Sequence, residues 1–301
     1  MFYTDFEEYL KYCDFISNGI GVRNIGTNGL KLTGEYLERV FTRLGFTTYK
    51  QPVEYCDKEG QTHPLFNVIS KIEGGEKKII FCAHYDTVPN CRGGIDNTSG
   101  LGVVIELAHT FKRILSTNNA LKEKLQQLLN STTLEFIALT GEEVGEVGSF
   151  AYVNSLTDKE KQNVIAAYNF DMFMGKIEDN TCLIAHTLGG FIDGLYKEGE
   201  EQNPIDNVIS LAVKKAIKEV EMEEGVMLDI WAPRHYGKSD HVPFHQNKIP
   251  SANLTIRGNK SLNGKMPKGY HKKEDVFDVK QFNLKDCKNY LEVVLRSVFL
   301  I

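Results

Sequence analysis

The segment FCAHYDTVPNCRGGIDNTSG, residues 81–100, places a histidine, two aspartates and several glycines directly after an apolar stretch. The apolar part belongs to KKIIFCAHYD (77–86), which is typical of a strand. Apolar residues then recur at helical spacing from about Thr98 onward. The segment is therefore a strand-to-helix connection. Its polar residues either cap the helix or belong to a reaction site, and the rest of the chain has to decide between the two.

Strands and helices alternate along most of the chain. Strands are predicted at 46–55, 67–74, 77–86, 132–139, 164–171 and 252–256, and helices at 37–44, 98–111, 148–156, 207–220 and from 282 onward. We expect the strands at 67–74 and 77–86 to be neighbours across the short GGE turn between them. This order predicts an α/β fold, a three-layer α/β/α sandwich with a mixed, largely parallel central sheet.

Composition and patterning limit the domain organisation and the partners. No repeat or linker composition interrupts the chain, so we expect a single domain over 1–301, with the polar stretch 186–204 as a candidate lid or rim loop. The net charge of −5 argues against nucleic acid and membrane surfaces, which leaves small molecules or peptides. No window is apolar enough to span a membrane, and residues 1–15 do not resemble a signal peptide. A cytoplasmic location is expected unless a leader was removed.

Polar clusters follow the predicted strands. His84 and Asp86 end one strand, the pair Glu142 and Glu143 follows the next, and Asp171 follows the third. In an open α/β sheet, ligands collect beyond the carboxyl ends of the strands. Two further candidates are Asp96, in the glycine-rich loop, and His271, in GYH (269–271). Imidazole and carboxylate donors without a thiolate suit a hydrolytic zinc site, and the six scattered cysteines lack the CxxC spacing of a structural one.

Each of these residues also has an ordinary structural interpretation. His84 alone could be a hydrogen-bonded histidine at a strand end, and DNTS (96–99) alone would be a helix cap. The two glutamates could be first-turn acids favoured by the helix dipole, and His271 could be a solvated loop side chain. Their joint occurrence at successive strand ends favours the functional interpretation.

The chemistry of peptide hydrolysis explains these residue types. Two zinc ions can generate hydroxide at neutral pH and stabilise the oxyanion; such a pair needs a bridging carboxylate, terminal ligands on each side, and a further carboxylate that accepts the proton of water. Adjacent glutamates can divide the last two tasks between them. His84 and Asp86 are two residues apart on a strand end and point to the same side, so Asp86 can orient the His84 ring.

The motifs HYD, GGIDNTSG, GEEVGEVGS, NFDM, SDHVPF and GYHKKED, in this order, resemble those of the co-catalytic di-zinc aminopeptidases, the group that includes aminopeptidase Y and the bacterial leucyl aminopeptidases. The resemblance runs from about residue 32 to the C-terminus. It implies two zinc ions per chain and a peptide substrate with a free N-terminus, and it leaves the oligomeric state open. The implied metal ligands are His84 and Asp171 on one zinc, Glu143 and His271 on the other, and Asp96 between them.

The resemblance also implies roles for residues that do not bind metal. Glu142 corresponds to the general base, Asp86 to the partner of the first histidine, and Tyr236 to a tyrosine that supports the oxyanion. Ser239 corresponds to a residue that supports the last histidine ligand. A cis peptide after the bridging aspartate, here Asp96–Asn97, is a further expectation. The remaining histidines of this region are expected not to be ligands: His235, His241 and His245.

Alternative functions share the same scaffold. Glutaminyl cyclases are similar in HYD, the glutamate pair and SDHVPF, but use a single zinc. The segments DNTSG and NFDM, and Tyr270 before His271, favour the peptidase. A carboxypeptidase or dipeptidase of the same superfamily is a further alternative. So is an inactive relative that serves as a binding module, although the presence of every ligand position argues against it.

Overall fold

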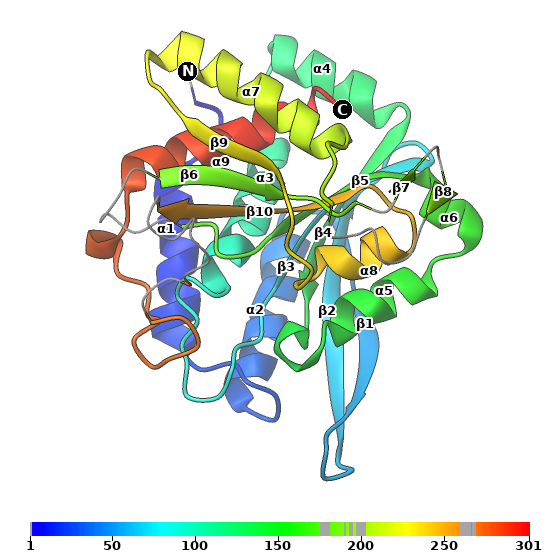
Figure 1. Ribbon diagram of the computed structural model, residues 1–301, viewed down its shortest axis with the longest axis vertical. Coiled ribbons are helices and arrows are strands. Elements are labelled where there is room, and N and C mark those ends of the chain that lie inside the picture. The colour runs from blue at the N-terminus through cyan, green and yellow to red at the C-terminus, as the bar shows by residue number, and fades with distance from the viewer. Residues whose placement is uncertain are drawn as a thin grey trace.

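A single mixed sheet organises the part of the chain that the structure describes (Figure 1). The computed structural model describes residues 2–174, 181–189, 191–192, 195–196, 203–258, 266 and 269–301. Within these residues the sheet has the spatial order β1 (Thr47–Cys56), β2 (Thr62–Ile72), β4 (Thr132–Leu139), β3 (Lys77–His84), β5 (Val164–Phe170), β10 (Ser251–Gly258), β6 (Thr181–His186) and β9 (Asp229–Arg234). The four central strands β4, β3, β5 and β10 are parallel, whereas β1, β2 and β6 pair antiparallel with their neighbours toward the centre.

Helices cover both faces of this sheet (Figure 1). The helical segments are α1 (Phe6–Asp14), η1 (Phe15–Ile20), α2 (Asn28–Arg43), α3 (Thr98–Ser116), α4 (Ala120–Leu129), η2 (Glu142–Val144), α5 (Val147–Ser155), α6 (Asp158–Asn163), α7 (Val208–Glu224), α8 (His241–Gln246), η4 (Val279–Gln281) and α9 (Leu284–Val298). Because helices cover both faces of one mixed sheet, the predicted three-layer α/β/α sandwich is confirmed.

In the described part of the chain, no helix has the length and apolar character needed to cross a membrane.

Strand β3 shows how the sequence builds two apolar layers. Successive side chains of a strand point to opposite faces. Ile79 and Phe81 belong to the larger core, which packs under α1, α2, α3, α7 and α9, whereas Ile80 and Cys82 belong to the smaller core under α5 and α8. All four side chains are fully buried. A central strand covered on both faces must be apolar throughout, which is why it appeared in the sequence as a continuous apolar run.

The predicted pairing of the strands at 67–74 and 77–86 is wrong. Strand β4 lies between β2 and β3, antiparallel to the first and parallel to the second. The GGE turn is not a hairpin but passes over the start of β4. A Cβ atom on Gly74 would lie 2.2 Å from the carbonyl oxygen of Thr132, and one on Gly75 would lie 2.2 Å from the carbonyl carbon of Ser131. The two glycines are needed because another strand passes directly beneath them.

About half of the candidate lid or rim loop at 186–204 lies outside the described residues. Of the described part, His186 ends β6, and β7 (Phe191–Ile192) pairs antiparallel with β8 (Leu195–Tyr196). The lid role stays a prediction.

Parallel pairing brings the ends of the central strands to one edge. His84, the last residue of β3, is opposite Leu139, the last residue of β4, and Phe170 at the end of β5 is opposite Leu254 of β10. The loops after β3, β4 and β5 therefore meet at the same carboxyl edge.

Candidate metal centre

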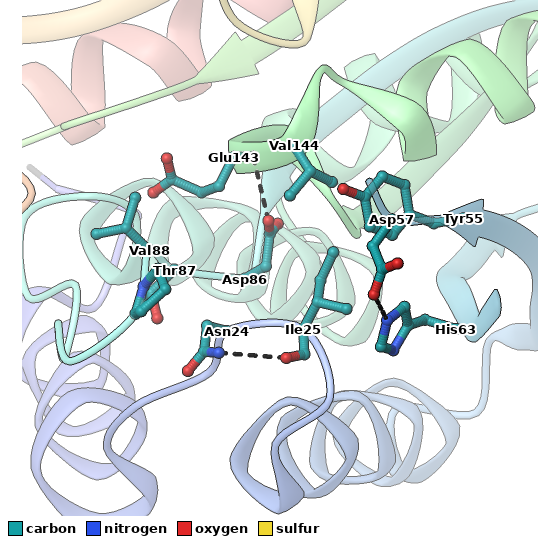
Figure 2. Close-up of a pocket in the computed structure, with 11 residues that line it drawn as sticks. Asn24, Ile25, Tyr55, Asp57, His63, Asp86, Thr87, Val88, Glu143 and Val144 are labelled. Atoms are coloured by element: carbon teal, nitrogen blue, oxygen red, sulfur yellow. Dashed lines mark hydrogen bonds and ion pairs between the residues drawn. The ribbon is translucent and has the colours of Figure 1, made fainter. Parts of the chain in front are cut away.

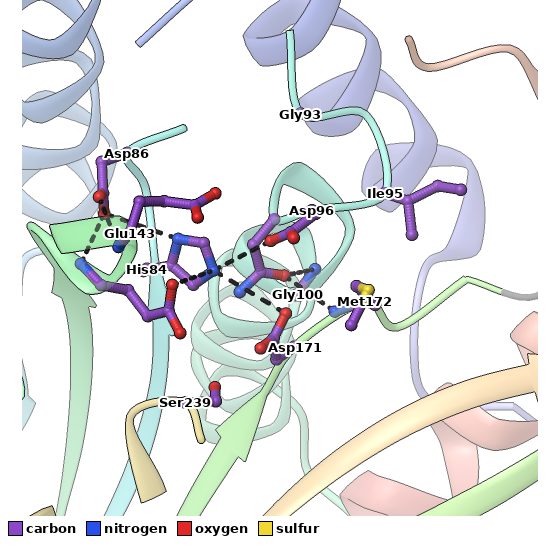
Figure 3. A network of polar contacts seen from close by, with 12 residues as sticks. His84, Asp86, Gly93, Ile95, Asp96, Gly100, Glu143, Asp171, Met172 and Ser239 are labelled. Atoms are coloured by element: carbon purple, nitrogen blue, oxygen red, sulfur yellow. Dashed lines mark hydrogen bonds and ion pairs between the residues drawn. The ribbon is translucent and has the colours of Figure 1, made fainter. Parts of the chain in front are cut away.

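The predicted ligands converge at this carboxyl edge. Figure 3 shows four of them, His84, Asp96, Glu143 and Asp171. They come from five separate places in the chain: His84 at the end of β3, Asp96 in the loop before α3, Glu143 in η2, Asp171 after β5, and His271 in the segment before η4. Four of the five side chains are buried or nearly so, and the exposed fraction of the His271 side chain is 37%. The fold thus places these side chains around one point, which opens to solvent on the His271 side.

Asp96 lies between the two histidines. Its Oδ1 atom is 3.2 Å from Nε2 of His84, and its Oδ2 atom is 3.3 Å from Nε2 of His271. The same His271 nitrogen is 3.1 Å from Oε2 of Glu143, while Nε2 of His84 is 3.8 Å from Oδ1 of Asp171. One carboxylate is therefore shared by two groups of potential ligands, His84 with Asp171 and Glu143 with His271.

The polar atoms of this cluster are incompletely paired. Among the described residues, neither ring nitrogen of His84 has a partner in hydrogen-bond geometry, and neither has Oδ1 of Asp171. Buried polar atoms are normally satisfied, and those that are not call for an explanation such as a bound ion. Although burial acts in the opposite direction, the surrounding carboxylates, led by Glu142, raise the pKa of His84 well above its usual value.

The charge of the cluster fits metal ions. Asp96, Glu142, Glu143 and Asp171 bring four carboxyl groups together in a largely buried space. Burial, and after it the charge of Asp171, raises the pKa of Glu142 well above its usual value, against the opposing effect of His84. Buried acids at this density need cations nearby, and imidazole and carboxylate donors without a thiolate suit zinc.

Asp86 positions the turn that carries both glutamates. Its two carboxylate oxygens accept the backbone amide hydrogens of Glu142 and Glu143, each at 3.2 Å. Its Oδ1 atom is 3.6 Å from Nδ1 of His84, which is longer than a hydrogen bond. Asp86 therefore lies beside His84, as the sequence predicts, but its hydrogen bonds go to η2. A single carboxylate connects the loop after β3 with the loop after β4.

Tyr236 and Ser239 lie in the segment that connects β9 with α8. The Tyr236 ring lies against that of His186 in a tilted arrangement, with centroids 5.2 Å apart and an interplanar angle of 43°. Burial, and after it the charge of Asp171, raises the pKa of Tyr236 well above its usual value. Ser239 accepts a hydrogen bond from Asn169 at 2.8 Å and donates its amide hydrogen to Glu146, so its observed partners do not include His271.

Two other histidines of this region each contact a backbone carbonyl oxygen through a ring nitrogen. His241 contacts the carbonyl oxygen of Tyr236 at 2.9 Å, and His245 contacts that of Gly189 at 2.8 Å. Within the described residues, the groups able to hold a metal ion contain neither of them, nor His235. The peptide bond between Asp96 and Asn97 is cis, as the resemblance implied.

The comparison with protein families decides the identity of this chain. The model of peptidase family M28 matches residues 67–297, a range that contains every predicted ligand. The chain belongs to peptidase family M28. The predicted resemblance to zinc aminopeptidases is thereby confirmed at the level of the family.

Relatives with known names support the same placement of this M28 chain. Aminopeptidase YwaD from Bacillus subtilis is 31% identical over 193 residues, which make up 64% of this chain. The chain covers only 34% of the length of that relative. Among solved structures, BSAP, a zinc aminopeptidase from Bacillus subtilis, matches with a TM-score of 0.78 at 17% identity, covering 98% of this chain and 95% of that one. A glutaminyl cyclase from Porphyromonas gingivalis matches with a TM-score of 0.68 at 17% identity, covering 99% and 98%. At such identities, the two structures show a shared fold.

Asp275 is a site residue of this M28 chain that the sequence analysis missed. Its carboxylate accepts the amide hydrogens of Ile95 at 2.7 Å and Asp96 at 3.1 Å, and its carbonyl oxygen accepts that of Gly94. A Cβ atom on Gly94 would lie 2.3 Å from the backbone of Val276, so a glycine is required for this close approach. Burial raises the pKa of Asp275 to about 6. The motif GYHKKED contains this residue, but no local pattern distinguishes its aspartate from a surface acid.

Arg23 holds the backbone of the loop between β3 and α3, and it was not predicted from the sequence either. The side chain is fully buried, and its guanidinium donates to the carbonyl oxygens of Tyr85, Arg92 and Gly93 and to the hydroxyl of Thr98. These acceptors lie at both ends of the loop that carries Asp96. Arg23 thus fixes the path of the backbone between β3 and α3, a role for which isolated arginines give no sequence signal.

Proposed function

We propose that this M28 chain is an aminopeptidase that removes the N-terminal residue of peptides at a pair of zinc ions. The observation that carries the proposal is the position of Asp96, whose two oxygens face His84 at 3.2 Å and His271 at 3.3 Å. A carboxylate shared between two sets of terminal ligands is what a two-metal hydrolytic site requires. The family match and the similarity to an aminopeptidase support the same activity.

The ligands divide into two sets. His84 and Asp171 would hold one ion, Glu143 and His271 the other, and Asp96 would contribute an oxygen to each. Zinc ions bound there would lower the pKa of a water molecule and polarise the scissile carbonyl group. Everything else in the reaction depends on the side chains that surround them.

Glu142 is the proposed general base. Its Oε2 atom is 3.9 Å from Nε2 of His84, so the carboxylate faces the ligands, while its backbone is held by Asp86. Glu142 accepts the proton of the attacking water and then donates it to the leaving nitrogen of the peptide. The Glu142 carboxyl group is largely buried, and this burial raises its pKa.

Tyr236 is proposed to stabilise the oxygen of the scissile carbonyl as negative charge develops on it. Its hydroxyl is protonated at neutral pH and can donate a hydrogen bond. Burial, followed by the charge of Asp171, raises its pKa further. The similarity to an aminopeptidase supports a peptide with a free N-terminus as the substrate.

Metal content and reaction products, measured together, test this proposal. We expect about two zinc ions per chain and release of the N-terminal residue from aminoacyl amides and short peptides. The segment SDHVPF and the fold shared with a glutaminyl cyclase make that enzyme the second candidate, which predicts one zinc ion and pyroglutamate formation from a glutaminyl peptide. Cleavage only of peptides with blocked N-termini would indicate a carboxypeptidase. Absence of both zinc and turnover would overturn the proposal.

A further inference from the structure

A cavity of about 260 Å³ lies next to the candidate metal centre (Figure 2). Four segments build it: the loop before α2 with Ile25, the hairpin β1–β2 with His63, the loop after β3 with Val88, and the turn η2 with Val144. Glu143, one of the predicted ligands, forms part of the wall. The cavity therefore borders the centre directly.

The outer wall of this cavity is a polar pair on the hairpin. Nε2 of His63 lies 2.8 Å from Oδ2 of Asp57, and the His63 ring stacks on that of Tyr55 with centroids 6.1 Å apart. Figure 2 shows this pair across the cavity from Val88 and Glu143. Because the side chain of His63 is only 17% exposed and is held on two sides, the wall has a defined shape. His63 also lines a second cavity, which continues toward Leu30 and Phe66.

The order of residues in η2 indicates which part of a substrate meets the cavity. In the proposed reaction, Glu142 returns a proton to the leaving nitrogen, so that nitrogen must lie beside the Glu142 carboxylate. The next two residues of the same turn, Glu143 and Val144, line the cavity. With the leaving nitrogen at Glu142, a chain that continues along η2 reaches this space first.

We propose that this cavity is the subsite for the side chain of the residue that follows the cleaved bond, and that it favours apolar side chains. The inference rests on the proposed aminopeptidase function. Ile25, Val88 and Val144 supply the apolar surface, and the His63–Asp57 pair forms the wall on the side of the hairpin. Ile25 and His63 are then specificity-determining residues that act on the leaving part of the peptide.

The test compares substrates that differ only after the cleaved bond. A panel of amino-acid amides first identifies the best N-terminal residue, X. The metal-loaded protein then receives X-amide, X-Gly-Gly and X-Leu-Gly. A leucine side chain that fills an apolar subsite raises kcat/KM on the order of tenfold or more, compared with a glycine that leaves the subsite empty. We expect X-Leu-Gly to exceed X-Gly-Gly by at least this factor, whereas X-amide has no side chain at this position.

A variant that fills the cavity should remove the preference. In Ile25→Trp, the ratio of kcat/KM for X-Leu-Gly to that for X-amide should fall at least tenfold relative to the wild type. Leu32→Trp is the matched control, because Leu32 is 41% exposed on α2 and lines neither cavity. It should keep the full preference for X-Leu-Gly.

Different outcomes identify different errors. If Ile25→Trp keeps the preference for X-Leu-Gly, or loses X-amide equally, the subsite assignment is wrong. If Ile25→Trp does not fold, Tyr55→Ala decides: it should raise turnover of X-Trp-Gly relative to X-Leu-Gly by at least threefold, and an unchanged ratio overturns the assignment. If the metal-loaded wild type cleaves no amide or peptide, the proposed function itself fails, and this inference fails with it.

Discussion

The carboxylate of Asp275 holds the backbone of Asp96, accepting its amide hydrogen at 3.1 Å and that of Ile95 at 2.7 Å. Asp275 follows His271 within the same short segment. The segment that would supply a terminal ligand to one metal thus also positions the carboxylate that both metals would share. Assembly of the two halves of the site is coupled through one loop.

Replacing Asp275 with asparagine should weaken metal binding. Asparagine keeps one acceptor oxygen, but its NH₂ group then faces a buried backbone N–H, and an unpaired buried donor costs about 1–3 kcal/mol. We expect zinc affinity to fall at least tenfold and the Tm to fall by about 2–4 °C for each kcal/mol. Calorimetric zinc titration of the metal-free protein and thermal unfolding measure the two effects. Glu274→Gln, at an exposed position of the same segment, is the control and should change neither. Unchanged zinc affinity in the Asp275 variant would contradict the positioning role.

Glu142→Gln should keep both metals and lose most of the turnover. Glutamine has the same shape but cannot accept a proton, and a general base contributes roughly 10²–10⁴-fold to rate. Metal analysis and kcat on an aminoacyl amide provide the two measurements. Glu54→Gln changes an exposed acid on β1 and should leave both unaffected. A kcat near that of the wild type in Glu142→Gln would remove this residue from its proposed role.

Asp96→Ala should disturb both metal sites, whereas Asp171→Ala should disturb one. The difference follows from geometry, because Asp96 faces His84 and His271 through different oxygens while Asp171 lies only near His84. Zinc content is expected to fall well below one per chain in the first variant and to remain near one in the second. Equal zinc content in the two variants would show that Asp96 is not shared. Circular dichroism checks that both variants remain folded.

Acid pH should destabilise the protein through two buried histidines. Burial lowers the pKa of both His241 and His186 from 6.5 to about 3. The unfolded chain binds these protons below pH 6.5, and the folded chain does not until about pH 3. Stability is therefore full above pH 6.5 and is lost as the pH falls through this interval. Each histidine contributes a slope of up to about 1.4 kcal/mol per pH unit.

His241→Gln tests this pH dependence. Glutamine preserves a donor for the carbonyl oxygen of Tyr236 but does not titrate. Between pH 7 and pH 5, the variant should lose about 2 kcal/mol less of its free energy of unfolding than the wild type does. Urea denaturation in the presence of a chelator measures this without a contribution from metal release. His235→Gln, at an exposed position, is the control. An identical pH dependence in wild type and His241→Gln would show that His241 does not remain neutral on folding.

The convergent residues were easier to predict from the sequence than the contacts that support them. His84, Glu142 and Asp171 were predictable because each follows an apolar strand, and parallel strands bring their carboxyl ends to one edge. Asp275 and Arg23 were not, because their partners are backbone groups far away in the chain, and the hydrogen bond from Ile95 to Asp275 spans 180 residues. Such contacts leave no local pattern. The pairing predicted across the turn at Gly74 was wrong for the same reason, since the strand that lies between β2 and β3 comes more than fifty residues later in the chain.

The sequence by itself determined the layered α/β architecture and the residue types at the carboxyl edge, because strand periodicity and strand-end loops are local properties. Only the tertiary structure decided that the two oxygens of Asp96 face different histidines, that Asp86 bonds to η2, and that a cavity opens behind Glu143. The physical reason is that these relationships depend on the placement of loops between elements. Buried hydrogen bonds to distant backbone groups determine that placement, and the pattern of any single segment does not encode it.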